Sequence, residues 1–300
     1  MTATPTVRAV GPWTHRTIHA RGMAFHVVVA GDEPGRHTVI LLADFPLHWW
    51  SWRHQIEDLA AAGWRVIAMD LRGMGASDLQ PGPVELHDLA EDVVAVADAT
   101  GTTSYTVVGA GVGGAVAWAV AHLRPAGLRS IVTVSAPHPL TKPAKSSRRG
   151  ARAARILRDP FRRKRRLRDG SLVEEILTTW CAPDAAAHLR EVAPEYATPL
   201  ERVFAVNAAL ELLHAATPSS SSKKMLEGAV EVPVLSVRGA EDPRVCGACF
   251  AQDPTLAGSA VTHLEIPAAG HFPNEETPAQ VTQILADHLA QVCPPASTGV

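Results

Sequence analysis

A glycine-rich turn at residues 109–113 has the layout of a nucleophile elbow, the strand–turn–helix segment G-x-Nuc-x-G that exposes a reacting side chain. Gly109 and Gly113 are the outer glycines, and Gly111 stands where the nucleophile belongs. The elbow position requires a positive φ, at which a non-glycine residue costs about 1–3 kcal/mol. Gly111 is therefore predicted to relieve backbone strain while it removes the atom that would form a covalent intermediate.

The same letters also satisfy G-x-G-x-x-G, the pattern of dinucleotide-binding loops, at Gly109, Gly111 and Gly114. Such a site needs an acidic residue about twenty positions later to hold the ribose hydroxyls. No Asp or Glu occurs between Asp98 and Asp159, and several predicted strands precede the turn, although this motif normally follows the first strand. The sequence therefore disfavours nucleotide binding, and no cofactor or metal is predicted.

The elements that must position this turn alternate between short apolar runs and longer helical periods. The predicted strands are residues 24–30, 38–42, 65–68, 105–109, 130–135, 232–237 and 261–266, and the predicted helices are residues 52–62, 84–100, 113–123 and 278–292. Continuous apolar strands that alternate with helices predict an α/β fold with a mostly parallel sheet covered on both faces. Ligands bind such a sheet at the carboxyl ends of its strands, where the elbow also lies.

The alternation stops over residues 140–228, where helical patterns continue without a convincing strand. Ser171 and Glu174 are predicted to form a capping box that opens an amphipathic helix, and the serine-rich run 218–224 is predicted to be a flexible connection. We therefore expect an α/β core of residues 1–139 and 229–300, with a helical cap of residues 140–228 inserted between two strands.

Several segments together resemble the α/β-hydrolase superfamily, and most closely its epoxide-hydrolase branch. Residues 45–55 are similar to the segment that follows the third strand of that family, and residues 70–78 match its signature D-x-R-G-x-G-x-S-D. Residues 232–243 resemble the strand and turn that carry the triad acid, and residues 269–276 resemble the loop of the triad histidine. The resemblance covers roughly residues 12 to 292 and implies an α/β-hydrolase fold with an inserted cap.

By this resemblance Asp242 takes the place of the triad acid and His271 that of the triad histidine. The order of elbow, acid and histidine along the chain is the one this fold uses. Asp242 would orient His271 and stabilise its imidazolium, and His271 would act as a general base toward water or a substrate hydroxyl. Gly111 leaves the nucleophile position of this triad vacant.

The oxyanion region departs from the family as well. The family usually has H-G-F-P after the third strand, whereas this chain has Ala-Asp-Phe-Pro, with Asp44 and Phe45 at its centre. A carboxylate at Asp44 would oppose the negative charge that develops there. Two other interpretations of Asp44 are a relocated carboxylate nucleophile and a solvated or helix-capping residue. Val112 follows the elbow, where epoxide hydrolases commonly have an aromatic residue.

The cap that the family would use to bind an epoxide oxygen lacks its usual tyrosine pair. Leucines stand in that stretch, and Tyr196 is the remaining tyrosine of the predicted cap. We expect a small apolar ligand in the cleft between core and cap, in a pocket formed by Phe45, Trp49, Trp50 and Tyr196. The interpretation of Tyr196 as a plain packing residue stays open.

Charge is distributed unevenly. The segment from Arg148 to Arg168 belongs to a stretch, residues 142–168, with thirteen basic residues and one acid, in a chain whose net charge is −2. This basic cap segment predicts either a solvated helix face or contact with an anionic partner or membrane surface, without sequence-specific nucleic-acid recognition. The pair Cys246 and Cys249 has no second ligand pair for zinc. The first 22 residues lack the apolar run of a signal peptide, so a cytoplasmic location is expected.

Two functions follow as hypotheses. The first is an epoxide-hydrolase-like protein that has lost covalent catalysis, a pseudoenzyme that binds a small ligand or recruits a partner. The second is a hydrolase or lyase in which the Asp242–His271 dyad acts as a general base without a covalent intermediate.

Overall fold

The computed structural model describes residues 6–31, 35–80, 82–142 and 148–293. Within these residues, eight strands form one sheet in the order β1-β2-β4-β3-β5-β6-β7-β8. The strands are β1 (Thr14–Ala20), β2 (Met23–Ala30), β3 (Thr38–Leu42), β4 (Arg65–Met69), β5 (Tyr105–Ala110), β6 (Leu128–Val134), β7 (Val234–Gly239) and β8 (Val261–Ile266). β2 pairs antiparallel with β1 and β4, and every other pairing is parallel. The prediction of a mostly parallel sheet is confirmed.

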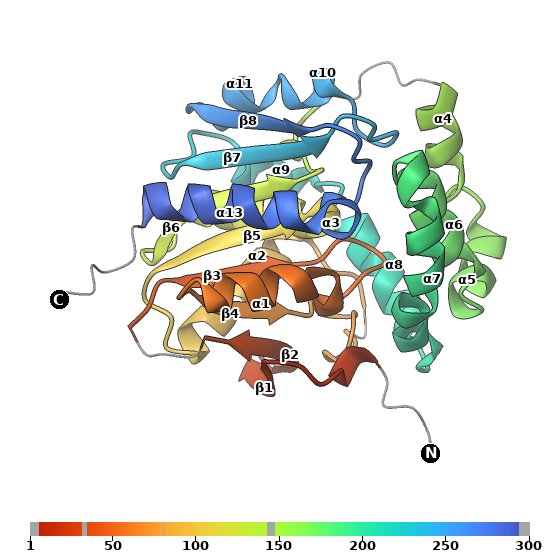
Figure 1. Cartoon of the computed structure of the whole chain (residues 1–300), viewed down its shortest axis with the longest axis horizontal. Coiled ribbons are helices and arrows are strands. Elements are labelled where there is room, and N and C mark those ends of the chain that lie inside the picture. The colour runs from red at the N-terminus through yellow and green to blue at the C-terminus, as the bar shows by residue number, and fades with distance from the viewer. Residues whose placement is uncertain (1–5, 32–34, 81, 143–147, 294–300) are drawn as a thin grey trace.

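Helices cover both faces of the sheet (Figure 1). α1 (Arg53–Ala61) and α13 (Pro278–Val292) contact each other on one face, and α2 (Leu86–Ala99) and α3 (Gly111–Leu123) contact each other on the opposite face. The strands β3, β4 and β5 are buried along their whole length, because apolar side chains of both helix layers pack on them. This central part of the sheet carries the loops of the site.

The segment between β6 and β7 is helical. It contains α4 (Arg148–Arg155), α5 (Pro160–Arg168), α6 (Ser171–Trp180), α7 (Ala186–Ala197), α8 (Ala205–Ala215) and α9 (Ser220–Met225). Figure 1 shows α4, α5, α6 and α7 stacked beyond the end of the sheet to which the arrowheads point. α9 instead contacts α2 and α3. The short helices α10 (Gly247–Phe250) and α11 (Asp253–Ala257) lie between β7 and β8, and α12 (Pro273–Glu276) precedes α13.

Three local predictions differ from the structure. The strand β1 was not predicted because its sequence, THRTIHA, is polar and lies at the exposed edge of the sheet. The run 218–224 is not a flexible connection: α9 begins there, and the Ser219 side chain accepts from the Ser222 N–H at 3.2 Å as its cap. Ser171 does not form a capping box, because it is already the first residue of α6 and Gly170 takes the cap position without a side chain.

A buried polar network joins α7 to the core. Tyr196 of α7 donates to Glu275 of α12, whose carboxylate also accepts from Arg53 of α1 at 2.6 and 3.0 Å. Burial would raise the pKa of Glu275, but the partners His188, Arg53 and Tyr196 lower it, so the carboxylate stays ionised. No helix of the described residues is long and apolar enough to cross a bilayer.

Candidate functional site

The loops after β7 and β8 bring the predicted dyad together. The Nδ1 atom of His271 lies 2.8 Å from Oδ2 of Asp242. The other carboxylate oxygen of Asp242 accepts from the N–H groups of Arg244 and Val245 at 2.7 and 3.1 Å, which fixes the carboxylate in its turn. Asp242 therefore orients the imidazole ring, and the opposite nitrogen, Nε2, points away from Asp242.

That second nitrogen faces Asp44. The distance from His271 Nε2 to Asp44 Oδ2 is 3.3 Å, and both side chains are 6% exposed. The alternative of a solvated Asp44 is therefore wrong, because the β3 loop directs this side chain into the protein. His271 lies between two carboxylates, Asp44 from the loop after β3 and Asp242 from the loop after β7.

The first oxygen of Asp44 is held by two backbone N–H groups. Its Oδ1 accepts from the N–H of Phe45 and from the N–H of Val112, each at 2.7 Å. One donor comes from the loop after β3 and the other from the first turn of α3. Two converging N–H groups of this kind can stabilise negative charge on an oxygen between them, as expected of the predicted oxyanion region. Here an oxygen of the protein's own carboxylate occupies that place.

Gly111 lies directly beside this carboxylate. It is the first residue of α3 and has a φ of +46°, as the elbow pattern predicts. A Cβ atom built on Gly111 would overlap with the carboxylate atoms of Asp44. The Asp44 carboxylate thus fills the space that a side chain at Gly111 would need, and the two positions cannot both carry a carboxylate in this arrangement.

The charges around His271 determine its protonation. Burial would lower its pKa, but the charge and hydrogen bond of Asp242 and the nearby Asp44 raise the pKa of His271 to about 9. At neutral pH the ring is an imidazolium between Asp242 and Asp44. In this state it is a proton donor, and it cannot accept a proton until one has left.

A cavity of about 340 Å³ opens beside these residues. Asp44, Phe45, Gly111, Val112 and His271 line it. Further walls come from α3, the loop after β6, α6, α8 and the residues that follow it, the loop after β7, and α10, through Ala115, Ser135, Ala136, Pro137, His138, Pro139, Thr141, Trp180, Leu213, Ala216, Thr217, Arg244, Val245 and Cys249. The prediction that the site lies at the carboxyl ends of the strands agrees with this position.

The predicted pocket residues Trp49, Trp50 and Tyr196 do not line this cavity. Trp49 is fully buried, with its ring edge-on to that of Trp13 at 5.4 Å. Trp50 packs on Tyr196 at 5.6 Å between ring centres, and Arg53 lies over its ring. The pocket prediction is wrong for these three residues, because the loop after β3 turns Trp49 and Trp50 into the core and toward α7, and Tyr196 of α7 points to Glu275. Sequence reasoning missed Trp180 and Arg244 instead.

Within the signature of residues 70–78, Asp70 holds the loop after β3, which carries Asp44. Asp70 accepts from the N–H groups of Trp49 and Ala76, each at 2.9 Å, and lies 2.7 Å from Nδ1 of His26. Burial would raise the pKa of Asp70, but its hydrogen bonds, with that to His26 first among them, lower it. This carboxylate therefore ties the loop after β3 to β2 and helps to position Asp44.

The basic cap segment and the cysteine pair are two further predicted features. The basic cap segment forms α4 and α5, where Arg152, Arg155, Arg162, Arg163 and Arg166 line a second cavity of about 400 Å³ together with Ile156, Asp159 and Glu175. Within the same segment, Arg149 donates to the carbonyl of Cys181. The Sγ atoms of Cys246 and Cys249 lie 3.6 Å apart at the start of α10.

Comparison with known proteins agrees with this fold. The model of the alpha/beta hydrolase fold family matches residues 38–278. The AB hydrolase superfamily protein YfhM of Bacillus subtilis is 36% identical over 124 residues, 41% of this chain and 43% of that protein. Epoxide hydrolase B of Mycobacterium tuberculosis is 41% identical over 127 residues, 41% of this chain and 35% of that protein. The chain thus spans less than half the length of these curated relatives.

Solved structures extend the likeness of the fold to nearly the whole chain. Epoxide Hydrolase A from Mycobacterium thermoresistibile has a TM-score of 0.76 at 21% identity and covers 92% of this chain and 98% of its own. A putative acyltransferase from Salmonella enterica has a TM-score of 0.82 at 20% identity over 97% and 98% of the two chains. The family match, the sheet order and the elbow between β5 and α3 lead to one conclusion: the chain belongs to the α/β-hydrolase family.

Proposed function

We propose that this protein is a hydrolase in which Asp44 has taken over the role of the carboxylate nucleophile from the elbow position, now Gly111, and that its substrates are epoxides. One observation carries the proposal: Asp44 Oδ1 occupies the oxyanion hole while Oδ2 faces His271 without a hydrogen bond of good geometry. A nucleophilic carboxylate needs this arrangement: one oxygen is stabilised by N–H groups, and the other oxygen is free to attack the substrate. The substrate class comes from the epoxide-hydrolase relatives.

In the first half of the reaction, a lone pair of Asp44 Oδ2 attacks an epoxide carbon, and a carbon–oxygen bond of the ring breaks. The ring oxygen leaves with the bonding electrons and takes the proton of the His271 imidazolium. This produces a hydroxyalkyl ester on Asp44 and a neutral imidazole. The usual cap tyrosines are not needed as proton donors, because His271 is protonated at neutral pH.

In the second half, neutral His271 removes a proton from water, whose oxygen attacks Cγ of Asp44. The N–H groups of Phe45 and Val112 stabilise the oxyanion that forms on Oδ1. The intermediate collapses with loss of the diol oxygen, which takes its proton back from His271. The carboxylic acid left on Asp44 then protonates His271 and restores the starting state.

The dyad by itself explains the site less well. Because the pKa of His271 is about 9, the resting imidazole is protonated at neutral pH and cannot act as a base. Esterification of Asp44 removes one of the two negative charges that hold this proton, so the pKa of His271 falls when a base is required. Covalent catalysis by Asp44 thus supplies a reason for the arrangement that general-base chemistry alone lacks.

The experiment looks for the ester directly. Wild type, His271→Gln and Asp44→Asn are incubated with a panel of epoxides that includes styrene oxide, and intact mass and peptide mapping follow. We expect wild type to turn over and, when quenched with acid during turnover, to carry an adduct on the peptide that contains Asp44. His271→Gln lacks the proton donor of the first step and should form neither adduct nor product. After single turnover in heavy-oxygen water, wild-type Asp44 should carry a heavy oxygen, and the peptide that contains Asp242 serves as the internal control.

The outcomes separate the hypotheses. Turnover that survives in Asp44→Asn, without an adduct in acid-quenched wild type, would overturn the proposal in favour of direct base catalysis by the dyad. If no epoxide in the panel gives turnover or an adduct, the protein acts as a binding module, and the Asp44 carboxylate only fills the space beside Gly111.

A further inference from the structure

Arg244 brings a positive charge to the catalytic cavity that the proposed reaction does not use. It lies in the loop after β7, two residues beyond Asp242, and it lines the same cavity as Asp44 and His271. Its guanidinium carbon lies 4.2 Å from the centre of the Trp180 ring. The backbone of Arg244 belongs to the loop after β7, and its guanidinium packs on the Trp180 indole, so the cation is held at the cavity.

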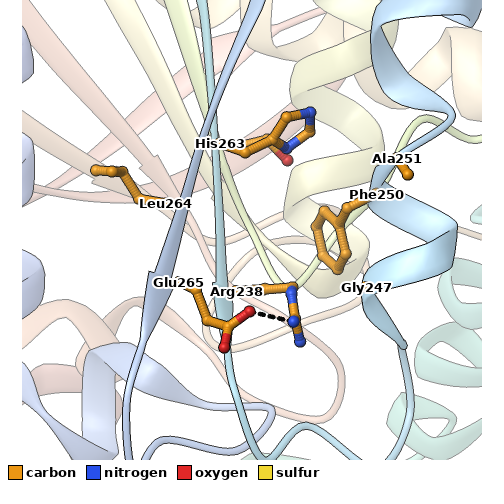
Figure 2. Close-up of a pocket in the computed structure, with 8 residues that line it drawn as sticks. Arg238, Gly247, Phe250, Ala251, His263, Leu264 and Glu265 are labelled. Atoms are coloured by element: carbon orange, nitrogen blue, oxygen red, sulfur yellow. Dashed lines mark hydrogen bonds and ion pairs between the residues drawn. The ribbon is translucent and has the colours of Figure 1, made fainter.

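The guanidinium has open donors. Among the described residues, no hydrogen bond or ion pair involves the Arg244 side chain, which keeps solvent-exposed surface even though the surrounding protein lowers its pKa through burial. Other arginines of the protein are paired. Figure 2 shows Arg238 joined to Glu265 in a separate cavity between β7, β8 and α10. A planar fork of unpaired donors fits the geometry of a carboxylate or phosphate.

The charge of the cavity permits an anionic ligand. At neutral pH the negative charges of Asp44 and Asp242 are balanced by protonated His271 and by Arg244. A ligand with one negative charge therefore meets no net repulsion, and it gains an unpaired cation at the cavity wall.

Two buried hydroxyl groups add hydrogen-bonding capacity beside this cavity. Ser135 and Thr141 line the cavity, and their Oγ and Oγ1 atoms are buried with no hydrogen-bond partner among the described residues. Ser135 also has a φ of +54°, a conformation that costs a non-glycine residue about 1–3 kcal/mol. A buried hydroxyl group without a hydrogen-bond partner is unfavourable in free energy, and a hydrogen bond to a ligand oxygen would remove this penalty.

We propose that the substrate of this site carries a carboxylate or phosphate group, which Arg244 binds while Asp44 attacks the reacting carbon. The inference rests on the proposed function for the reaction but not for the binding. The apolar part of the cavity, which includes Phe45 and Val112, accommodates the carbon skeleton, and Arg244 adds the requirement for an anionic end to the small apolar ligand expected from the sequence.

The test compares matched neutral and anionic probes. Binding of glycerol, glycerate and glycerol 3-phosphate is measured by calorimetry, and turnover of glycidol, glycidate and glycidyl phosphate is measured in parallel. The proteins are wild type, Arg244→Gln, Arg244→Lys and the control Arg238→Gln, which removes an arginine from the other cavity. Binding of the diol probes does not require Asp44 to act as a nucleophile, so the two proposals can fail separately.

We expect wild type to prefer one of the anionic probes, and Arg244→Gln to lose about 10- to 100-fold in affinity for that probe, the loss expected for a charge-assisted pair. Arg244→Lys should keep part of the preference, and the affinity for glycerol should not change. Tighter binding of glycerate would indicate that the site recognises a carboxylate, and tighter binding of glycerol 3-phosphate would indicate a phosphate. Equal affinities for neutral and anionic probes in wild type, or an equal loss in Arg238→Gln, would overturn the inference.

Discussion

The competition between Gly111 and Asp44 for one space can be measured as a coupling free energy. In the variant Gly111→Asp, a side chain at φ +46° costs about 1–2 kcal/mol, because the left-handed region is unfavourable for non-glycine residues. The new side chain also displaces the Asp44 carboxylate from the N–H groups of Phe45 and Val112. Each hydrogen bond to a charged group contributes about 1.5–3 kcal/mol, so Gly111→Asp should lose about 4–8 kcal/mol in the free energy of unfolding.

The double variant Asp44→Gly/Gly111→Asp should retain only the backbone cost. The carboxylate at position 111 can then use the two N–H groups that Asp44 has vacated, as in the usual order of the family. The coupling between the two substitutions should therefore be favourable by at least about 3 kcal/mol, well beyond the additivity expected of independent sites.

The assay is urea unfolding of wild type, both single variants and the double variant, with the m-value checked for constancy. Gly101→Asp is the matched control, because Gly101 has a φ of +67° with no atom within 4 Å of the added Cβ. It should show the backbone cost of about 1–2 kcal/mol without coupling to Asp44. If the effects of Asp44→Gly and Gly111→Asp simply add, the Asp44 carboxylate does not occupy the space beside Gly111, and the proposed nucleophile loses its structural basis.

Three further predictions concern protonation, the cap and charge. Because the pKa of His271 rises from 6.5 to about 9 on folding, its ion pairs contribute about 3 kcal/mol of stability that is complete below pH 6.5 and lost as the pH rises through 9. Urea unfolding of wild type and His271→Gln at pH 6 and 9.5 should show a stability difference that shrinks at the higher pH, and a constant difference would contradict the ion pairs. Glu275→Gln leaves Arg53 without its buried anionic partner and should lower the free energy of unfolding by about 3–5 kcal/mol. Tyr196→Phe should lower it by less. Equal, small effects of the two substitutions in thermal unfolding would refute the network as a link between α7 and the core. If the basic cap segment meets an anionic partner, wild type should bind heparin or anionic liposomes at low salt. Charge reversal in Arg148 to Arg168 should abolish this binding. If wild type does not bind either probe, the segment is a solvated helix face.

The fold could be predicted from the sequence largely because its strands are continuous apolar runs. The segments that became β3 and β8 have the predicted bounds, and α13 does as well. β1 could not be found in this way, since a polar edge strand is stabilised by its pairing with β2 and not by its own burial pattern. The helix α9 was missed for a related reason: its serines have weak helix propensity, and the helix forms where it packs on α2 and α3.

The site was predictable where a motif fixes a residue to the end of a strand. Asp242 and His271 are within hydrogen-bond distance because the loops after β7 and β8 end side by side. The pocket was not predictable, since the side chains of Trp49 and Trp50 depend on how the loop after β3 turns, which their spacing does not reveal. Arg244 carried one available signal, a basic residue two positions after the predicted triad acid, and Trp180 was recognisable only as part of an apolar helix face.

The vacancy at Gly111 and the acid at Asp44 are best understood as one change in the protein. An oxyanion hole is built from both the loop after β3 and the first turn of α3, so a carboxylate can reach it from either element. A side chain from the β3 loop needs the room beside the elbow, and glycine at position 111 provides it at a backbone conformation that glycine also tolerates best. Had the elbow residue been lost without replacement, the two buried N–H groups of Phe45 and Val112 would lack an acceptor, at a cost of several kcal/mol, and His271 would keep only Asp242 as its anionic partner. If Asp44 is the nucleophile, as proposed, it still requires the proton that His271 carries, which gives a reason for the dyad to remain in place.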